Sequence, residues 1–198
     1  MAIVKKHDFV DIEYTGRLKE DNSVFDTKIA VICVGENTLL KSVEERMIGM
    51  ETGKEYSFEI SAEQAFGRKD AGLLQLIPLS KFRQQNIQPV PGLQLNIDGV
   101  FGIVKTVSGG RCYVDFNHPI AGKDLAYEIK INRIVDDDKE KINSLLNFQL
   151  DIKDAKIELN EGSVTINSKS EIPKEAQDEF RKIAERVIPG IKSVEFLK

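Results

Sequence analysis

The chain has 198 residues, 41% of them hydrophobic, with 28 basic and 32 acidic residues and a formal charge of −4. This composition supports one sizeable core or several small ones, and the acidic net charge gives no indication of nucleic-acid binding. The apolar runs are far too short to cross a bilayer, and the first residues lack the apolar run of a signal peptide. We therefore expect a cytoplasmic protein with no nucleic acid and no membrane among its partners.

The N-terminal part of the chain predicts short strands and one helix. Residues 8–14 alternate apolar and polar side chains with period two, which indicates a half-buried strand. A turn signal at residues 21–23 separates it from a second extended run over residues 24–32. Residues 38–50 keep helical spacing, and residues 56–60 alternate again. One helix among several strands is typical of an α+β fold.

The charge density falls between residues 70 and 120, where only seven of 51 residues are charged. Prolines and glycines punctuate short apolar runs there, which predicts a small all-β subdomain over residues 71–118. The chain then returns to an alternating strand over residues 125–131.

The last part of the chain predicts a second α+β unit. The acidic run of residues 136–138 indicates a boundary, and a hairpin, a helix opening near Pro173 and a final strand follow it. We expect residues 139–198 to form a β-β-α-β module that folds separately. The apolar stripe of its helix is interpreted as core, with a homodimer face as the alternative; it consists of Ala176, Phe180, Ile183, Ala184 and Val187.

Few side chains are available for metal or nucleophilic chemistry. Cys33 and Cys112 lie in apolar runs, which favours reduced, packed thiols. The two histidines, His7 and His118, form no cluster with metal-ligand spacing, so we expect no metal and no cofactor. A hydrolase is disfavoured because the sequence has no Gly-x-Ser-x-Gly motif.

Six short motifs follow one another in the order found in the FKBP family of prolyl isomerases. They are residues 11–18, 24–27, 34–40, 48–55, 65–67 and 117–125. The resemblance extends over essentially all of residues 8–135, and it is to the SlyD-like, insert-bearing archaeal branch of that family. The low-charge stretch falls where this branch carries an inserted chaperone domain in the flap.

The resemblance implies a twisted antiparallel sheet wrapped on one helix, with an inserted flap subdomain and a small C-terminal domain. It assigns residues 1–70 and 119–138 to the isomerase core, 71–118 to the chaperone insert, and 139–198 to a C-terminal extension. It implies a rotamase with chaperone activity whose clients are unfolded or proline-containing polypeptides. Macrolide inhibitors are further ligands that the resemblance implies.

The resemblance also implies a catalytic pocket, whose residues by position are Tyr14, Phe25, Asp26, Leu39, Leu40, Phe66 and Tyr127. Val43 is expected at its floor, and Ile120 and Leu125 at its edge. An apolar pocket suits this chemistry because the twisted amide has less charge separation than the planar one.

The apolar residues of the insert exceed what a module of roughly 50 residues can bury alone. We therefore expect an exposed client-binding patch that includes Leu76, Ile77, Phe82, Ile87, Val90 and Leu95.

An alternative function is a client-binding chaperone, or holdase, with weak isomerase activity. Two departures from the family pattern favour it. Ala30 stands where active members often have an aromatic residue, and Phe66 stands where tyrosine is commoner.

Overall fold

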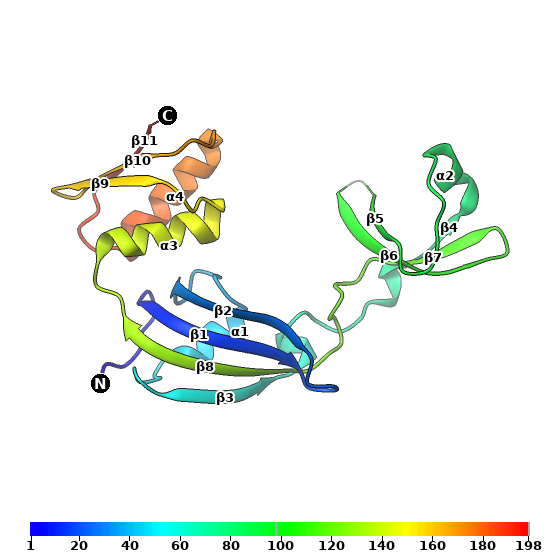
Figure 1. Cartoon of the computed structure of the whole chain (residues 1–198), viewed down its shortest axis with the longest axis horizontal. Coiled ribbons are helices and arrows are strands. Elements are labelled where there is room, and N and C mark those ends of the chain that lie inside the picture. Colours follow the sequence, from blue (N-terminus) through cyan, green and yellow to red (C-terminus); the bar gives the residue numbers. More distant parts are fainter. Residues whose placement is uncertain (98, 198) are drawn as a thin grey trace. The chain divides into compact units, whose positions relative to one another are not determined.

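The computed structural model describes residues 1–97 and 99–197. Their contacts divide the chain into two compact units (Figure 1). The first contains residues 1–60 and 126–198, and the second contains residues 61–125. The boundaries expected at residues 70 and 118 stay a prediction.

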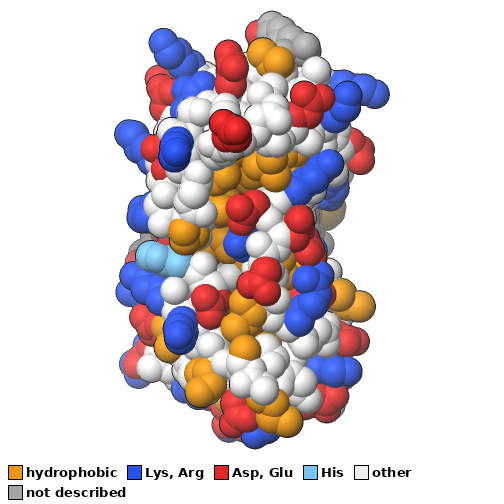
Figure 2. Space-filling view, turned by 90° about the vertical axis from the view of Figure 1, so that its left-hand side faces the viewer, with side chains coloured by type: hydrophobic (Ala, Val, Ile, Leu, Met, Phe, Trp, Pro, Cys, Tyr) orange, Lys and Arg blue, Asp and Glu red, His pale blue; other side chains and the backbone are white. Residues whose placement is uncertain are grey.

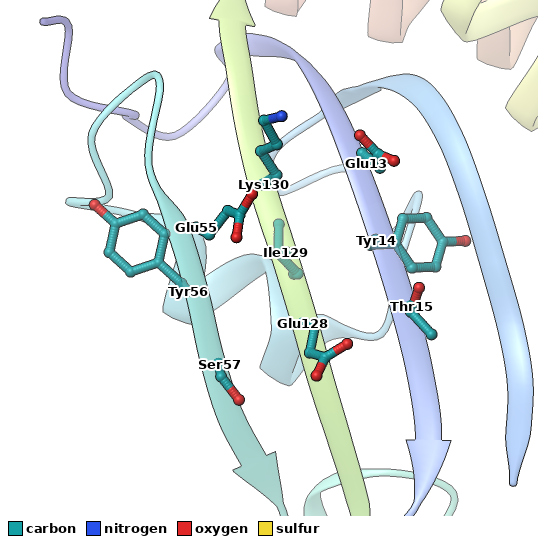
Figure 3. A pocket seen from close by; sticks show the side chains of 9 residues that line it. All are labelled: Glu13, Tyr14, Thr15, Glu55, Tyr56, Ser57, Glu128, Ile129 and Lys130. Atoms are coloured by element: carbon teal, nitrogen blue, oxygen red, sulfur yellow. The ribbon is translucent and has the colours of Figure 1, made fainter. Parts of the chain in front are cut away.

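A four-stranded sheet forms the centre of the first unit. It contains β1 (Phe9–Leu18), β2 (Val24–Cys33), β3 (Glu55–Ile60) and β8 (Leu125–Ile134), in the order β2-β1-β8-β3. β1 and β2 pair antiparallel, and Figure 3 shows β8 running opposite to both β1 and β3. The helix α1 (Lys41–Met47) lies behind this sheet in Figure 3 and buries Val43 and Met47. The α+β prediction of a sheet with one helix behind it is confirmed, although the helix is shorter than the 38–50 expected.

A β-bulge interrupts the pairing of β1 with β2. Gly16 pairs with Asp26, but the next residue, Arg17, pairs with Val24. Phe25 is therefore the extra residue on β2. Bulges bend a strand and change the direction of a side chain, and this one lies among the expected pocket residues.

The C-terminal part of the first unit contains two helices and a three-stranded sheet. Its elements are α3 (Asp138–Leu150), β9 (Lys156–Asn160), β10 (Ser163–Asn167), α4 (Lys174–Val187) and β11 (Ser193–Leu197). β10 pairs antiparallel with β9 and parallel with β11.

The sequence analysis missed α3 because the acidic run before it was interpreted as a boundary. Asp137 is instead the N-cap of this helix, and its side chain accepts a hydrogen bond from the Glu140 amide at 2.7 Å. Acidic residues in a first helical turn also stabilise the helix, because they interact favourably with its dipole.

One hydrophobic core joins the C-terminal part to the first sheet. Phe9, Cys33 and Val135 pack in the same cluster as residues of α3, α4 and the three-stranded sheet. Ser144 on α3 donates a hydrogen bond to the Val31 carbonyl of β2 at 2.6 Å. Separate folding of residues 139–198 stays a prediction, but in the intact chain the two parts bury apolar surface against each other.

The main residues of the alternative homodimer face on α4 are buried in this core. Phe180 is fully buried and Val187 nearly so, while Ile183 is half-buried against the same cluster. These side chains pack inside the chain, which agrees with the interpretation of the apolar stripe of this helix as core.

The second unit contains a four-stranded antiparallel sheet with the order β4-β7-β6-β5. Its elements are β4 (Leu74–Pro78), α2 (Leu79–Gln84), β5 (Gln94–Ile97), β6 (Val100–Ser108) and β7 (Arg111–Asp115). The short helix α2 was not expected in a subdomain predicted to be all-β. Phe82 on α2 packs into a small core with Leu95, Val104, Cys112 and Val114.

The surface carries both signs of charge. Figure 2 shows lysine, arginine, aspartate and glutamate side chains interspersed over one face of the molecule. Within residues 1–97 and 99–197, no helix is long and apolar enough to span a membrane.

Candidate active site

Four aromatic rings surround the centre of the first sheet. Tyr127 on β8 is buried, and the ring of Phe25 meets it edge-on with 5.9 Å between centroids. Phe58 on β3 stacks on Tyr127 at 6.2 Å, and Tyr14 on β1 lies 6.4 Å away. We call Tyr14, Phe25, Phe58 and Tyr127 the aromatic cluster. Tyr127 is the residue that the other three share.

A hydroxyl–carboxylate pair accompanies the aromatic cluster. The Tyr14 hydroxyl donates a hydrogen bond to Oδ2 of Asp26 at 2.8 Å. Burial, followed by this hydrogen bond, raises the pKa of Tyr14 above its ordinary value. Burial and the charge of Asp26 raise the pKa of Tyr127 to about 12. Both phenols are therefore neutral at physiological pH.

The bulge explains how two consecutive residues of β2 reach the same cluster. Neighbouring residues of a regular strand point to opposite faces of a sheet. Phe25 nevertheless contacts Tyr127, and Asp26 binds Tyr14. Gly16 provides space for this arrangement, because a Cβ there would lie 2.7 Å from the Phe25 ring.

A buried carboxylate organises the loop of residues 35–40, which carries the expected pocket residues Leu39 and Leu40. Glu44 on α1 is almost fully buried. Its Oε2 accepts hydrogen bonds from the amides of Gly35 at 2.8 Å and Asn37 at 3.2 Å. Its Oε1 accepts from the Thr38 hydroxyl and the Leu39 amide, both at 2.8 Å. A single side chain thus fixes the backbone of the whole loop.

The remaining expected residues of the first unit differ in exposure. Val43 is fully buried, whereas Leu39, Leu40 and Ala30 are half-buried and Asp26 is exposed. Leu39 and Leu40 therefore keep apolar surface accessible next to the start of α1, as residues of a pocket wall must.

The expected residues Phe66 and Ile120 lie in the second unit, and Leu125 is the buried first residue of β8. The Phe66 ring stacks on the His118 imidazole, with 4.1 Å between centroids and 5° between planes. Ile120 is half-buried. Asn117 ties the two segments that flank the insert, because it binds the backbone amide and carbonyl of Asp70.

A hollow of about 510 Å³ lies over the other face of the first sheet (Figure 3). Its lining is Glu13, Tyr14, Thr15, Glu55, Tyr56, Ser57, Glu128, Ile129 and Lys130. Glu13 and Thr15 flank Tyr14 on β1 and point away from the face that Tyr14 buries. A hollow lined by charges suits isomerisation less well than the aromatic cluster, since an apolar environment favours the twisted amide.

The six insert residues expected at the client surface fall into three groups. Leu76 is 53% exposed and Val90 is 52% exposed. Ile77 and Ile87 are half-buried against the core of the insert. Phe82 and Leu95 are buried inside that core, which removes them from the accessible surface in this structure.

The structure adds two residues to the insert surface that the sequence analysis did not select. Phe101 is 72% exposed, and Tyr113 is also exposed. Tyr113 lies directly opposite Leu76, and the pairing of Ile103 with Asp115 places Phe101 on the same face of the sheet. We call Leu76, Phe101 and Tyr113 the exposed insert face.

Comparison with known proteins gives matches over most of the chain. A family model described as FKBP-type peptidyl-prolyl cis-trans isomerase matches residues 2–89, and one described as FKBP26, IF domain, matches residues 75–120. The short-type peptidyl-prolyl cis-trans isomerase of Methanocaldococcus jannaschii is 30% identical over 150 residues, covering 67% of this chain and 94% of that protein. The chain belongs to the FKBP-type peptidyl-prolyl cis-trans isomerase family.

Bacterial relatives of this FKBP-type isomerase agree with that assignment. The 16 kDa FKBP-type isomerase of Escherichia coli K12 is 24% identical over 139 residues, covering 66% of this chain and 93% of that protein. The isomerase SlyD of Helicobacter pylori is 28% identical over 127 residues, covering 61% of this chain and 69% of that protein. The predicted family, fold class and reaction type are confirmed.

Of the seven expected catalytic residues, the structure brings Tyr14, Phe25, Asp26 and Tyr127 together. The assignment of these residues to catalysis stays a prediction. Phe58 was absent from the expected set because the alternation of its strand predicts only that its side chain is buried, and does not predict what it contacts. Its contact with Tyr127 follows from the order of the strands, which no local sequence signal contains.

Proposed function

We propose that this isomerase turns X–Pro bonds of unfolded or partly folded polypeptides at the aromatic cluster, with its insert holding the client chain. The observation that carries the proposal is the packing of Phe25, Phe58 and Tyr14 around Tyr127. Amide resonance sets a barrier of roughly 18–20 kcal/mol, and rotation needs no covalent intermediate. A site that binds the twisted amide better than the planar one is sufficient.

The cluster supports such differential binding in two ways. The rings of Phe25, Phe58 and Tyr127 supply an apolar environment that favours the less polar, twisted amide. The Tyr14–Asp26 hydrogen bond fixes the positions of the Tyr14 hydroxyl and the Asp26 carboxylate beside those rings. A fixed polar pair stabilises the transition state without reorganising during the reaction.

The insert contributes by raising the local concentration of the client. Exposed apolar side chains that share one face commonly mark a protein-binding surface. A client held by Leu76, Phe101 and Tyr113 would present its prolines repeatedly to the catalytic pocket, because both sites belong to one chain.

Turnover of a short proline tetrapeptide by pocket variants tests the proposal. Tyr127→Ala should lower kcat/KM by about 100-fold, because the ring that the cluster shares is lost. Tyr127→Phe should keep it within about threefold, and Asp26→Asn should lower it less than Tyr127→Ala does, since polarity is the smaller effect. If Tyr127→Ala folds and turns over the peptide like the parent, the aromatic cluster is not the catalytic site.

The second candidate function is a client-binding chaperone with weak isomerase activity. The 72% exposure of Phe101 supports it. Ala30 supports it as well, because this half-buried alanine stands where active family members often have an aromatic residue. Strong suppression of aggregation together with tetrapeptide turnover near the uncatalysed rate would favour this function over the first.

Two finer expectations remain predictions. A macrolide inhibitor should compete with the tetrapeptide for the same pocket. A homodimer would need a surface other than Phe180 and Val187, which are buried in the chain itself.

A further inference from the structure

An ion pair connects the C-terminal helix α4 to the loop of residues 35–40. Arg186 donates a hydrogen bond from Nη2 to Oε2 of Glu36 at 2.5 Å. The other carboxylate oxygen of Glu36 lies 3.5 Å from Nε2 of His7. Glu36 and Arg186 are 150 residues apart in the sequence, so this contact joins distant parts of the chain.

The Glu36 carboxylate cannot remain in this position unpaired at low cost. Its side chain is only 6% exposed, whereas that of Arg186 is 55% exposed. Removing Arg186 would leave this poorly hydrated carboxylate with His7 alone, at 3.5 Å, and a buried charge that has lost a partner is costly. If Arg186 were lost, the simplest relief would be a movement of the loop that returns Glu36 to water.

Such a movement would disturb the pocket wall. Glu36 lies between Gly35 and Asn37, whose amides both bind Glu44. The Glu44 carboxylate also accepts a hydrogen bond from the Leu39 amide. The loop is thus held from inside by Glu44 and from outside by Arg186, and a shift at Glu36 is transmitted to Leu39 through one shared set of hydrogen bonds.

We propose that Arg186 is a positioning residue for the isomerase reaction, through which the C-terminal domain holds the loop that carries Leu39 and Leu40. This inference rests on the proposed function and on the expectation, implied by the family resemblance, that the two leucines line the catalytic pocket. It assigns the C-terminal domain a part in catalysis although Arg186 itself touches no substrate.

Steady-state turnover of the tetrapeptide by full-length variants tests this proposal. Arg186→Gln should lower kcat/KM by about tenfold, since small misplacements of a pocket wall are costly. Adding Glu36→Gln to that variant should restore kcat/KM to within about threefold of the parent, because the neutral amide can stay in place without its partner. A purely structural role of Arg186 within α4 would not be rescued by a change at Glu36.

Arg181→Gln is the matched control on the same helix. Arg181 binds the Val194 carbonyl and Asp178, both in the C-terminal domain, so its loss removes an ion pair without touching the loop. We expect parental turnover from this variant. Equal losses in Arg181→Gln and Arg186→Gln would attribute the effect to general destabilisation of the domain and overturn the proposal.

Hydrogen exchange of the Leu39 amide gives a readout that does not depend on activity. Exchange at Leu39 should accelerate by about tenfold in Arg186→Gln and return toward the parental rate in the double variant. If Leu39 exchange accelerates while turnover is unchanged, the loop is coupled to α4 but is not part of the pocket, which overturns the catalytic role. Unchanged exchange at Leu39 in Arg186→Gln overturns the coupling between α4 and the loop. This outcome does not depend on the turnover of Tyr127→Ala, which tests the proposed function.

Discussion

The ring of Phe25 on β2 lies directly against Gly16 on β1, where an added Cβ would come within 2.7 Å of it. Gly16→Ala should push the Phe25 ring away from Tyr127. We expect kcat/KM for the tetrapeptide to fall by about tenfold, with a loss of about 1–3 kcal/mol in the free energy of unfolding from overpacking. Turnover and urea unfolding of the same preparation measure both effects.

Gly102→Ala offers a matched control in the other unit. A Cβ on Gly102 would also come within 2.7 Å of an aromatic ring, that of Phe116. This variant should lose a similar amount of stability while keeping parental turnover of a short peptide. Parental turnover from Gly16→Ala, with the Phe25 ring displaced from Tyr127, would remove Phe25 from the mechanism.

The neutral phenols of the pocket predict a specific dependence on pH. Because the pKa values of Tyr14 and Tyr127 are raised, the native state keeps both protons where the unfolded chain, with a pKa of about 10, loses them. The two phenols therefore leave stability unchanged below about pH 10 and make it fall as the pH rises from 10 toward 12. Tyr127→Phe should flatten this fall by about 1.4 kcal/mol per pH unit, as measured by urea unfolding at pH 9, 10 and 11. An equally steep fall in that variant would contradict burial of the phenol.

Truncation after Asp138 should weaken the isomerase core. It would expose the face of the first sheet on which Phe9, Cys33 and Val135 are now buried. Uncovering three such side chains should reduce the free energy of unfolding by about 3–6 kcal/mol, which approaches the whole stability of a small domain. A truncated protein that unfolds at the parental urea midpoint would show that the first sheet does not need α3.

Substitution of the exposed insert face should separate client binding from catalysis. Leu76→Ser combined with Phe101→Ser should leave tetrapeptide turnover unchanged and stability nearly so, because both side chains are exposed. Acceleration of proline-limited refolding of a whole protein should fall by about tenfold. Val104→Ala, in the core of the insert, is the control for lost insert stability. Parental refolding activity from the double variant would place the client elsewhere.

Much of the fold was predictable because its signals are local. The alternation over residues 8–14 and 56–60 predicted strands that the structure contains as β1 and β3. The helix α3 was not predicted because its buried residues pack against three elements, β2, α4 and β9, so they do not form a single apolar stripe. The six-residue α2 is too short to show a helical period at all.

The site was less predictable because its geometry depends on contacts between distant residues. A period-two pattern assigns Phe25 and Asp26 to opposite faces, and only the bulge explains how both serve one cluster. Glu44 looks in the sequence like any charged residue of a surface helix. Its partners are backbone amides of a loop, which carry no side-chain signal.

The core of the first unit also determines when the enzyme can finish folding on the ribosome. Phe9 on β1 and Val194 on β11 are far apart in the sequence, yet both belong to one hydrophobic cluster. The isomerase sheet therefore emerges early but must wait for α3, which packs on β2, and for the elements that complete the shared core. Contacts of such sequence separation form slowly, and domains tend to fold in the order of their synthesis. During that interval a folding catalyst exposes the same kind of apolar surface that its clients present to it, so we expect the nascent chain to depend on other chaperones.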